Sequence, residues 1–278
     1  MKVVVTPLGY AAALLTLSAG GGRVLAQVPA DVRWSLEGNR GSYCIWYLAD
    51  PDLARQMVPA GVALAPAGTG AGLPPLLART VQDEPRFGQW IPGAICIGAY
   101  LRVTADGRTL VQGKAESPVI VGTSSLGAHQ ARGLPTASNY LIDFMTDKRS
   151  LARAADAVGF GMGGISVLSK NQVGADDPRV SISVDGVQIT WSGHAIGDSG
   201  VVKTRSVSFG YATGRGARWL IELESVPAST RLMAGTLEVD GRNTLARALK
   251  ASPVRAIGPE ESGGVLTLTF HQATHQSP

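Results

Sequence analysis

Short runs of alternating apolar and polar positions, separated by turn-forming residues, dominate the sequence. This alternation is typical of β-strands with one buried face. The clearest hairpin joins VSISV (180–184) to VQITW (187–191) through Asp185-Gly186, a dipeptide that favours a tight turn. The same dipeptide at Asp106-Gly107 predicts a second hairpin. Further strands are predicted at 42–49, 94–103, 140–146, 202–212, 219–226, 230–239 and 263–270.

Few segments have the pattern of a helix. Asp50 can cap a short helix over 52–58, with Pro51 at its first position, and Pro59 ends it. Two more helices are predicted at 147–158 and at 243–250, while 60–76 and 121–139 are predicted to be loops. About ten strands with two or three short helices predict a mostly-β (α+β) domain, a barrel or sandwich with the helices outside.

The first 26 residues have the features of a secretory signal. Lys2 gives a positive start, residues 3–19 are uncharged and largely apolar, and the small Ala26 fits a cleavage site. The alternative is a membrane anchor, but the apolar run is short for a spanning helix. We therefore predict a signal peptide over 1–26, one domain over 27–278, and export to the periplasm or the extracellular space. No later stretch is apolar and long enough to cross a bilayer.

Charge and metal-ligating residues exclude several function classes. The chain carries a formal net charge of +4, which falls to +2 without Lys2 and Arg23. The basic residues are dispersed, so nucleic acid is not a predicted partner. His271 and His275 have a metal-ligand spacing but no acidic third ligand nearby, so no metal site is predicted. The acidic pair Glu260-Glu261 beside Pro259 is interpreted as a solvated turn.

The chain contains two cysteines, Cys44 and Cys96, and both lie in predicted apolar strands. An even number of cysteines in an exported protein favours a disulfide. Two buried free thiols are the alternative, and the sequence leaves both open.

Residues 159–164 (GFGMGG) have the glycine spacing of a dinucleotide-binding loop. That loop needs a strand before it and a helix after it. Here the order is reversed, because a helix-like segment comes first and the strand-like ISVLS (165–169) follows. No dinucleotide site, and no cofactor of any kind, is predicted.

Four collinear segments resemble the acetoacetate decarboxylase family and together cover most of residues 38–270. They are RGSYCIWYLADPDLARQMVP (40–59), YLIDFMTD (140–147) with its following helix and Gly159-Phe160, VSISVDGVQIT (180–190), and IELESVPASTRLMAGTLEVDGRNTLARALKASPVRAI (221–257). The resemblance implies a single, largely antiparallel β-barrel or cone with an apolar internal pocket and a few short peripheral helices. It also implies a homo-oligomer and a lysine that forms a Schiff base with a β-keto acid.

The sequence departs from the family at the residues that would perform this chemistry. The family's Pro-Lys-Lys falls at Gly161-Met162-Gly163, so both lysines are missing, and the acid of its Gly-x-Tyr-x-Glu falls at Pro92. Arg40 matches the family's arginine, whose implied role is to contact the substrate carboxylate. An ordinary surface residue is the alternative for Arg40.

We therefore predict an exported protein that binds a small carboxylate-bearing or apolar molecule in its barrel, without decarboxylation through a lysine imine. The predicted ligand-binding residues are Arg40, Trp90, Phe160, Met162 and Gly163. Two alternatives remain open. One is an active β-keto-acid decarboxylase, a carbon–carbon lyase, with a relocated lysine such as Lys114. The other is a non-catalytic envelope interaction module without a pocket.

Overall fold

The structure is a computed structural model. It describes residues 32–69, 73–129, 139–157, 163–167, 179–184, 186–199, 206–214, 217–227, 229–258 and 260–273. The predicted signal peptide therefore lies outside the described residues. None of the helices in the described ranges is long and apolar enough to cross a membrane.

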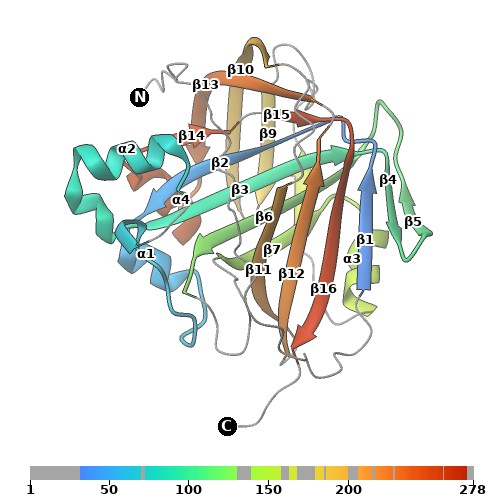
Figure 1. Cartoon of the computed structure of the whole chain (residues 1–278), viewed down its shortest axis with the longest axis horizontal. Helices are drawn as coiled ribbons and strands as arrows, with labels where there is room; N and C mark the ends of the chain where they lie inside the picture. The colour runs from blue at the N-terminus through green and yellow to red at the C-terminus, as the bar shows by residue number, and fades with distance from the viewer. Residues whose placement is uncertain are drawn as a thin grey trace, which may run out of the picture.

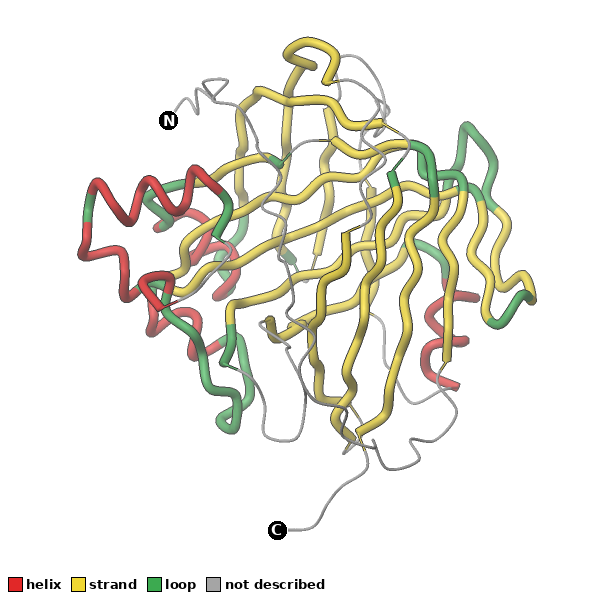
Figure 2. Tube along the Cα trace, viewed as in Figure 1, coloured by secondary structure: helices red, strands yellow, loops and turns green. Residues whose placement is uncertain are grey.

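Strands make up most of the described chain (Figures 1 and 2). The strands are β1 (Val32–Glu37), β2 (Gly41–Ala49), β3 (Ile91–Tyr100), β4 (Arg102–Ala105), β5 (Arg108–Gln112), β6 (Val119–Gly127), β7 (Asn139–Thr146), β8 (Gly163–Val167), β9 (Arg179–Val184), β10 (Val187–Ser199), β11 (Ser206–Gly214), β12 (Ala217–Val226), β13 (Ser229–Asp240), β14 (Arg255–Ile257), β15 (Glu260–Ser262) and β16 (Val265–Ala273). The helices are α1 (Pro51–Gln56), α2 (Pro75–Asp83), α3 (Arg149–Ala157) and α4 (Thr244–Ala251), with two 3₁₀ turns, η1 (Ala67–Thr69) and η2 (Pro85–Gln89).

The strands form one continuous sheet that nearly closes into a barrel. From β7 the order runs through β6, β3, β2, β15, β13, β10, β9 and β8, and β8 pairs with β7 again. The edge of β7 that β8 contacts near its end also pairs with β11 near its start, at Tyr140. From β11 the sheet continues through β12, β16, β1, β4 and β5. The ladders are antiparallel except β7–β11 and β7–β8. The predicted mostly-β barrel with a few short helices is confirmed.

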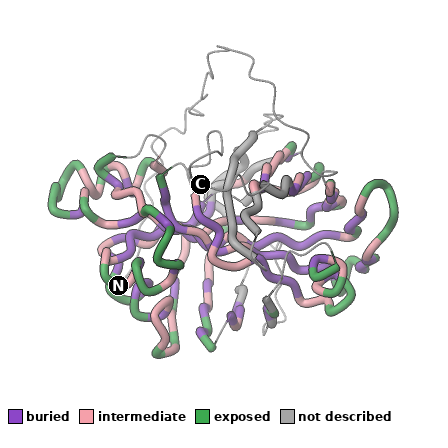
Figure 3. The backbone as a smooth tube through the Cα atoms, turned by 90° about the horizontal axis from the view of Figure 1, so that it is seen from below, coloured by how far each residue is buried: buried purple, intermediate pink, exposed green. Residues whose placement is uncertain are grey.

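Two hydrophobic cores lie on opposite faces of β3, β6 and β7. Inside the closed part, alternate residues of β2 (Tyr43, Ile45 and Tyr47) pack with Ile95 and Trp191 in what we call the barrel core. On the other face, residues of β3, β6 and β7 pack against β1, β12, β16 and α3, in what we call the second core. Figure 3 shows buried residues along the strands and exposed ones mainly in the loops and helices. The shared strands are therefore buried on both faces.

The helices begin where the sequence places their caps. Asp50 accepts hydrogen bonds from the backbone N–H groups of Asp52 and Leu53, and Asn243 caps α4 in the same way through Ala246. In Figure 1, α1, α2 and α4 gather at one end of the molecule, away from α3. The three predicted helices are confirmed to within two residues at their starts.

Some elements were missed by the sequence prediction. Strand β6 was not predicted. It occupies residues 121–127 of the segment 121–139, which the sequence predicted to be a loop. Most of its residues are buried, so its sequence, VIVGTSSLG, lacks the alternation of a half-exposed strand. Helix α2 was also missed, because Pro74 and Pro75 at its start resemble the Pro-rich loop before it. Pro75 is instead the first helical residue, where proline is tolerated.

Candidate functional site

A cavity of about 410 Å³ lies on the face of β2, β3 and β6 that points away from the barrel core. The register of the β2–β3 ladder builds its floor. Since side chains alternate between faces, Tyr43 and Ile45 enter the barrel core while Ser42, Cys44 and Trp46 turn to the cavity. Strands β12 and β16 form the opposite wall with Leu223, Ser225, Leu266 and Leu268. Most of the lining is apolar.

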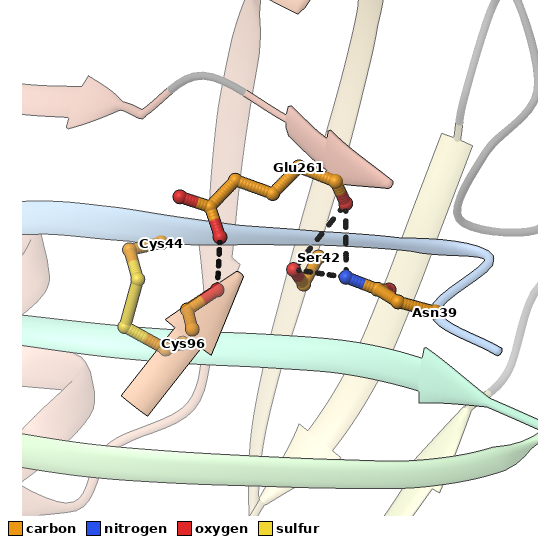
Figure 4. The surroundings of a disulfide bond; sticks show 6 residues. Asn39, Ser42, Cys44, Cys96 and Glu261 are labelled. Atoms are coloured by element: carbon orange, nitrogen blue, oxygen red, sulfur yellow. Dashed lines mark hydrogen bonds between the residues drawn. A yellow bond between two sulfur atoms is a disulfide. The ribbon is translucent and has the colours of Figure 1, made fainter. Parts of the chain in front are cut away.

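A disulfide between Cys44 and Cys96 forms part of the floor (Figure 4). The two residues are directly opposite each other in the antiparallel β2–β3 ladder, with Cα atoms 4.0 Å apart. The bond links residues 52 positions apart in sequence. Of the two states that the sequence left open, the structure therefore has the disulfide and not two free thiols.

The ring of Tyr100 closes the cavity beside the disulfide. A Cβ added to Gly98 would overlap the Tyr100 hydroxyl group, so only glycine at this position lets the ring lie over the strand. The Tyr100 hydroxyl interacts with the side chain of Ser42. Burial, and secondarily the charge of Glu261, raises the pKa of the Tyr100 phenol, while the Ser42 hydrogen bond opposes the shift. Tyr100 therefore stays a neutral hydroxyl.

Glu261 supplies the one carboxyl group among the described lining residues. The Ser225 hydroxyl donates a 3.0 Å hydrogen bond to Glu261 Oε2. The backbone carbonyl of Glu261 accepts from Asn39 Nδ2 at 3.2 Å and from Ser42 Oγ at 3.3 Å, which fixes β15 against the start of β2. Figure 4 shows the Glu261 side chain extending from this anchored backbone toward the disulfide. The cavity therefore has a polar end held by β2, β12 and β15.

Burial raises the pKa of the Glu261 carboxyl group above its ordinary value, and the hydrogen bond from Ser225 opposes the rise only in part. The surroundings of Glu261 therefore favour its neutral, protonated form more than water does.

This shift predicts a pH-dependent contribution to stability. The native state holds the Glu261 proton to higher pH than the unfolded chain does, so ionisation costs the native state more. As pH rises from the ordinary glutamate pKa of about 4.3 through the raised value, the wild type should lose stability relative to Glu261→Gln. Urea unfolding of both proteins across this range measures the difference. Glu238→Gln, at an exposed position of β13, controls for the lost charge, and equal profiles for the wild type and Glu261→Gln would contradict the prediction.

The predicted ligand-binding residues do not gather at this cavity. Arg40 is exposed, and its backbone N–H donates to the carbonyl of Ala99 at 2.7 Å. Trp90 packs edge-on against Phe87, with ring centroids 5.2 Å apart, in a third cluster beside α2. Gly163 begins β8, opposite Met145 of β7. Phe160 and Met162 lie outside the described residues, so their predicted role is not tested here.

The sequence interpretation of Glu261 as a solvated turn residue is wrong. Its neighbour Pro259 suggested a surface turn, but β15 pairs with β2 and β13 and carries Glu261 to the cavity. No local pattern distinguishes it, because its partners Ser42 and Ser225 are 219 and 36 residues away. In the described ranges, no group of three or more His, Cys, Asp or Glu side chains is placed to hold a metal ion.

Comparison with known proteins gives a likeness in structure alone. No protein-family model matches the sequence, and no curated protein matches it. Among solved structures, acetoacetate decarboxylase from Legionella pneumophila is 13% identical, with 92% of this chain and 93% of that chain covered and a TM-score of 0.50. The enduracididine biosynthesis enzyme MppR complexed with pyruvate is 13% identical, with 96% of each chain covered and a TM-score of 0.43.

An acetoacetate decarboxylase-like enzyme from Sphingomonas wittichii is 12% identical, with 91% of this chain and 96% of that chain covered and a TM-score of 0.41. The likeness to the Legionella pneumophila enzyme spans nearly the whole of both chains and agrees with the β-barrel that the sequence resemblance implied. The chain therefore has the fold of acetoacetate decarboxylase.

Proposed function

We propose that this protein binds a small, predominantly apolar molecule in the cavity between β2–β3–β6 and β12–β16. The observation that carries the proposal is an apolar cavity of about 410 Å³ with polar groups at one end. Ligand pockets in proteins are commonly of this size and this composition, with a few polar groups that orient the ligand. Glu261, Ser225 and Ser42 are the orienting groups here.

The proposed binding does not include decarboxylation through a lysine imine. Three lysines lie in the described ranges, and none of them lines the cavity. Lys114, the suggested relocated lysine, is exposed in the turn before β6. Lys148 is paired with Asp147, and Lys250 donates to the carbonyl of Gly241. An imine needs a neutral amine at the substrate, so these positions support a binding function better.

Export remains part of the proposal. It rests on the charged start, apolar run and small residue at Ala26 of the first 26 residues. The Cys44–Cys96 disulfide is compatible with this location, because structural disulfides persist in oxidising compartments.

Filling the cavity should weaken binding. Thr123 of β6 lines the cavity, and Thr123→Phe would place a large ring within it. Affinity for the uncharged fluorescent dye N-phenyl-1-naphthylamine is expected to fall about ten-fold or more, since overfilling a packed site costs about 1–3 kcal/mol. Titration of the purified mature protein with the dye, followed by fluorescence, measures the affinity.

Thr109→Phe is the matched control, because Thr109 is exposed on β5 and makes the same change outside the cavity. Circular dichroism confirms that both variants are folded. Wild-type affinity in Thr123→Phe, or an equal loss in Thr109→Phe, would place the dye elsewhere and reject the proposal.

A further inference from the structure

The charges at the cavity are unbalanced. Glu261 is the only formally charged residue among the described lining residues, and no lysine, arginine or histidine accompanies it. Ser225 occupies Oε2. None of the described residues donates a hydrogen bond to the other carboxyl oxygen, Oε1. An ionised carboxylate in apolar surroundings is unfavourable unless a positive group pairs with it. The described lining residues include no such positive group.

Aromatic rings surround the same space. Trp46, Tyr100 and Phe144 all contribute to the lining. Aromatic faces attract cations through their electron-rich π systems, and they also provide apolar surface for a hydrocarbon chain. A carboxylate together with aromatic rings is the combination that favours an organic cation over a neutral or anionic molecule. An ionised Glu261 would instead repel an anionic ligand.

We propose that the ligand of this cavity is a small hydrophobic primary amine, whose ammonium group donates to Glu261 Oε1 while its hydrocarbon part occupies the apolar space. This inference rests on the proposed function, because it names the class of molecule that the same cavity binds. The ammonium supplies the missing positive charge, and its hydrogen bond to a carboxylate is of the strong, charge-assisted kind.

The affinity for an amine should depend on pH in a definite direction. Pairing requires Glu261 ionised, and burial raises the pKa of this carboxyl group. Affinity should therefore rise with pH through that raised pKa. It should fall again only when the ligand loses its own proton, at about pH 10.4 if an alkylamine has the pKa of a lysine side chain. Among the described lining residues whose side chains face the cavity, the other titratable group is the phenol of Tyr100. Burial raises the pKa of Tyr100, which keeps it uncharged in this range.

A competition experiment tests the ligand class. Hexylamine, hexanol and hexanoate share one carbon chain and differ in the end group. Each is titrated at neutral pH as a competitor of N-phenyl-1-naphthylamine bound to the mature protein. Hexylamine is expected to compete at a concentration about ten-fold lower than hexanol does, because a hydrogen bond between charged groups is worth about that ratio in affinity. Hexanoate is expected to be the weakest competitor.

Glu261→Gln should bring the hexylamine-to-hexanol ratio close to one, whereas Glu238→Gln, on the exposed side of β13, should keep the wild-type ratio. If the wild type binds the dye but hexanol competes as well as hexylamine, or hexanoate competes best, the amine inference is overturned and the proposed function stands. If the wild type binds neither the dye nor any of the three competitors, the proposed function itself is overturned.

Discussion

Replacing Cys44 and Cys96 together by alanine is expected to lower the free energy of unfolding by about 4 kcal/mol, the largest effect that we predict for this protein. The disulfide joins residues 52 positions apart, and opening a loop of this length releases considerable conformational entropy in the unfolded chain. A domain is commonly stable by only about 5–15 kcal/mol, so the variant should be close to the limit of folding. Urea unfolding measures the change.

Two measurements test whether this loss of stability comes from the missing cross-link. The unfolded chain without the bond exposes more surface, so the dependence of unfolding free energy on urea should become steeper. The wild type treated with a reducing agent keeps both sulfur atoms in the cavity wall, and it should lose nearly as much stability as the double variant. A reduced wild type as stable as the oxidised protein would show that the bond contributes little.

Gly264→Ala is expected to destabilise the protein by about 3 kcal/mol, the second largest effect, because it combines backbone strain with a clash. Gly264 lies in the turn between β15 and β16 with φ +70°, a conformation that residues with a Cβ rarely adopt. An added Cβ would also overlap the carbonyl oxygen of Val226, at the end of β12. Neither atom can move without shifting the β12–β16 pairing, where Val226 is opposite Val265. Urea unfolding again measures the loss.

Gly107→Ala separates the two causes. Gly107 has φ +80° in the β4–β5 turn, but an added Cβ there meets no atom within 4 Å. This variant should lose only the cost of the backbone conformation, about 1 kcal/mol. Equal losses at Gly107 and Gly264 would show that the contact with Val226 relaxes at little cost.

The elements that the sequence predicts well are those with local causes. The Asp50-Pro51 cap sets the start of α1, and Asp106-Gly107 sets the β4–β5 hairpin, where both residues have positive φ. The sequence offered the disulfide as one of two open states, because Cys44 and Cys96 have only each other as partners. The barrel followed from the number of strands and from the resemblance.

The cavity could not be predicted, because its causes are nonlocal. Ser42 and Glu261 meet through the β2–β15 pairing, and Ser225 reaches the same point from β12. The side of the sheet on which a cavity lies depends on volumes packed from many strands. The sequence interpretation followed the family pattern to Arg40 and Trp90, which the structure places outside the cavity lining. β6 was hidden for a related reason, since burial on both faces removes its alternation.

The floor of the cavity is a single layer of backbone whose reverse side fills the barrel. Ile45 and Ile95 are paired across β2 and β3 next to the disulfide, and both side chains point into the barrel core. A larger side chain at either position would displace the β2–β3 backbone toward a bound molecule, although that side chain itself would not contact the molecule. Selection for altered specificity in a laboratory library should therefore recover substitutions behind the floor as well as within the cavity, and a map of affinity changes would be broader than the map of contacts.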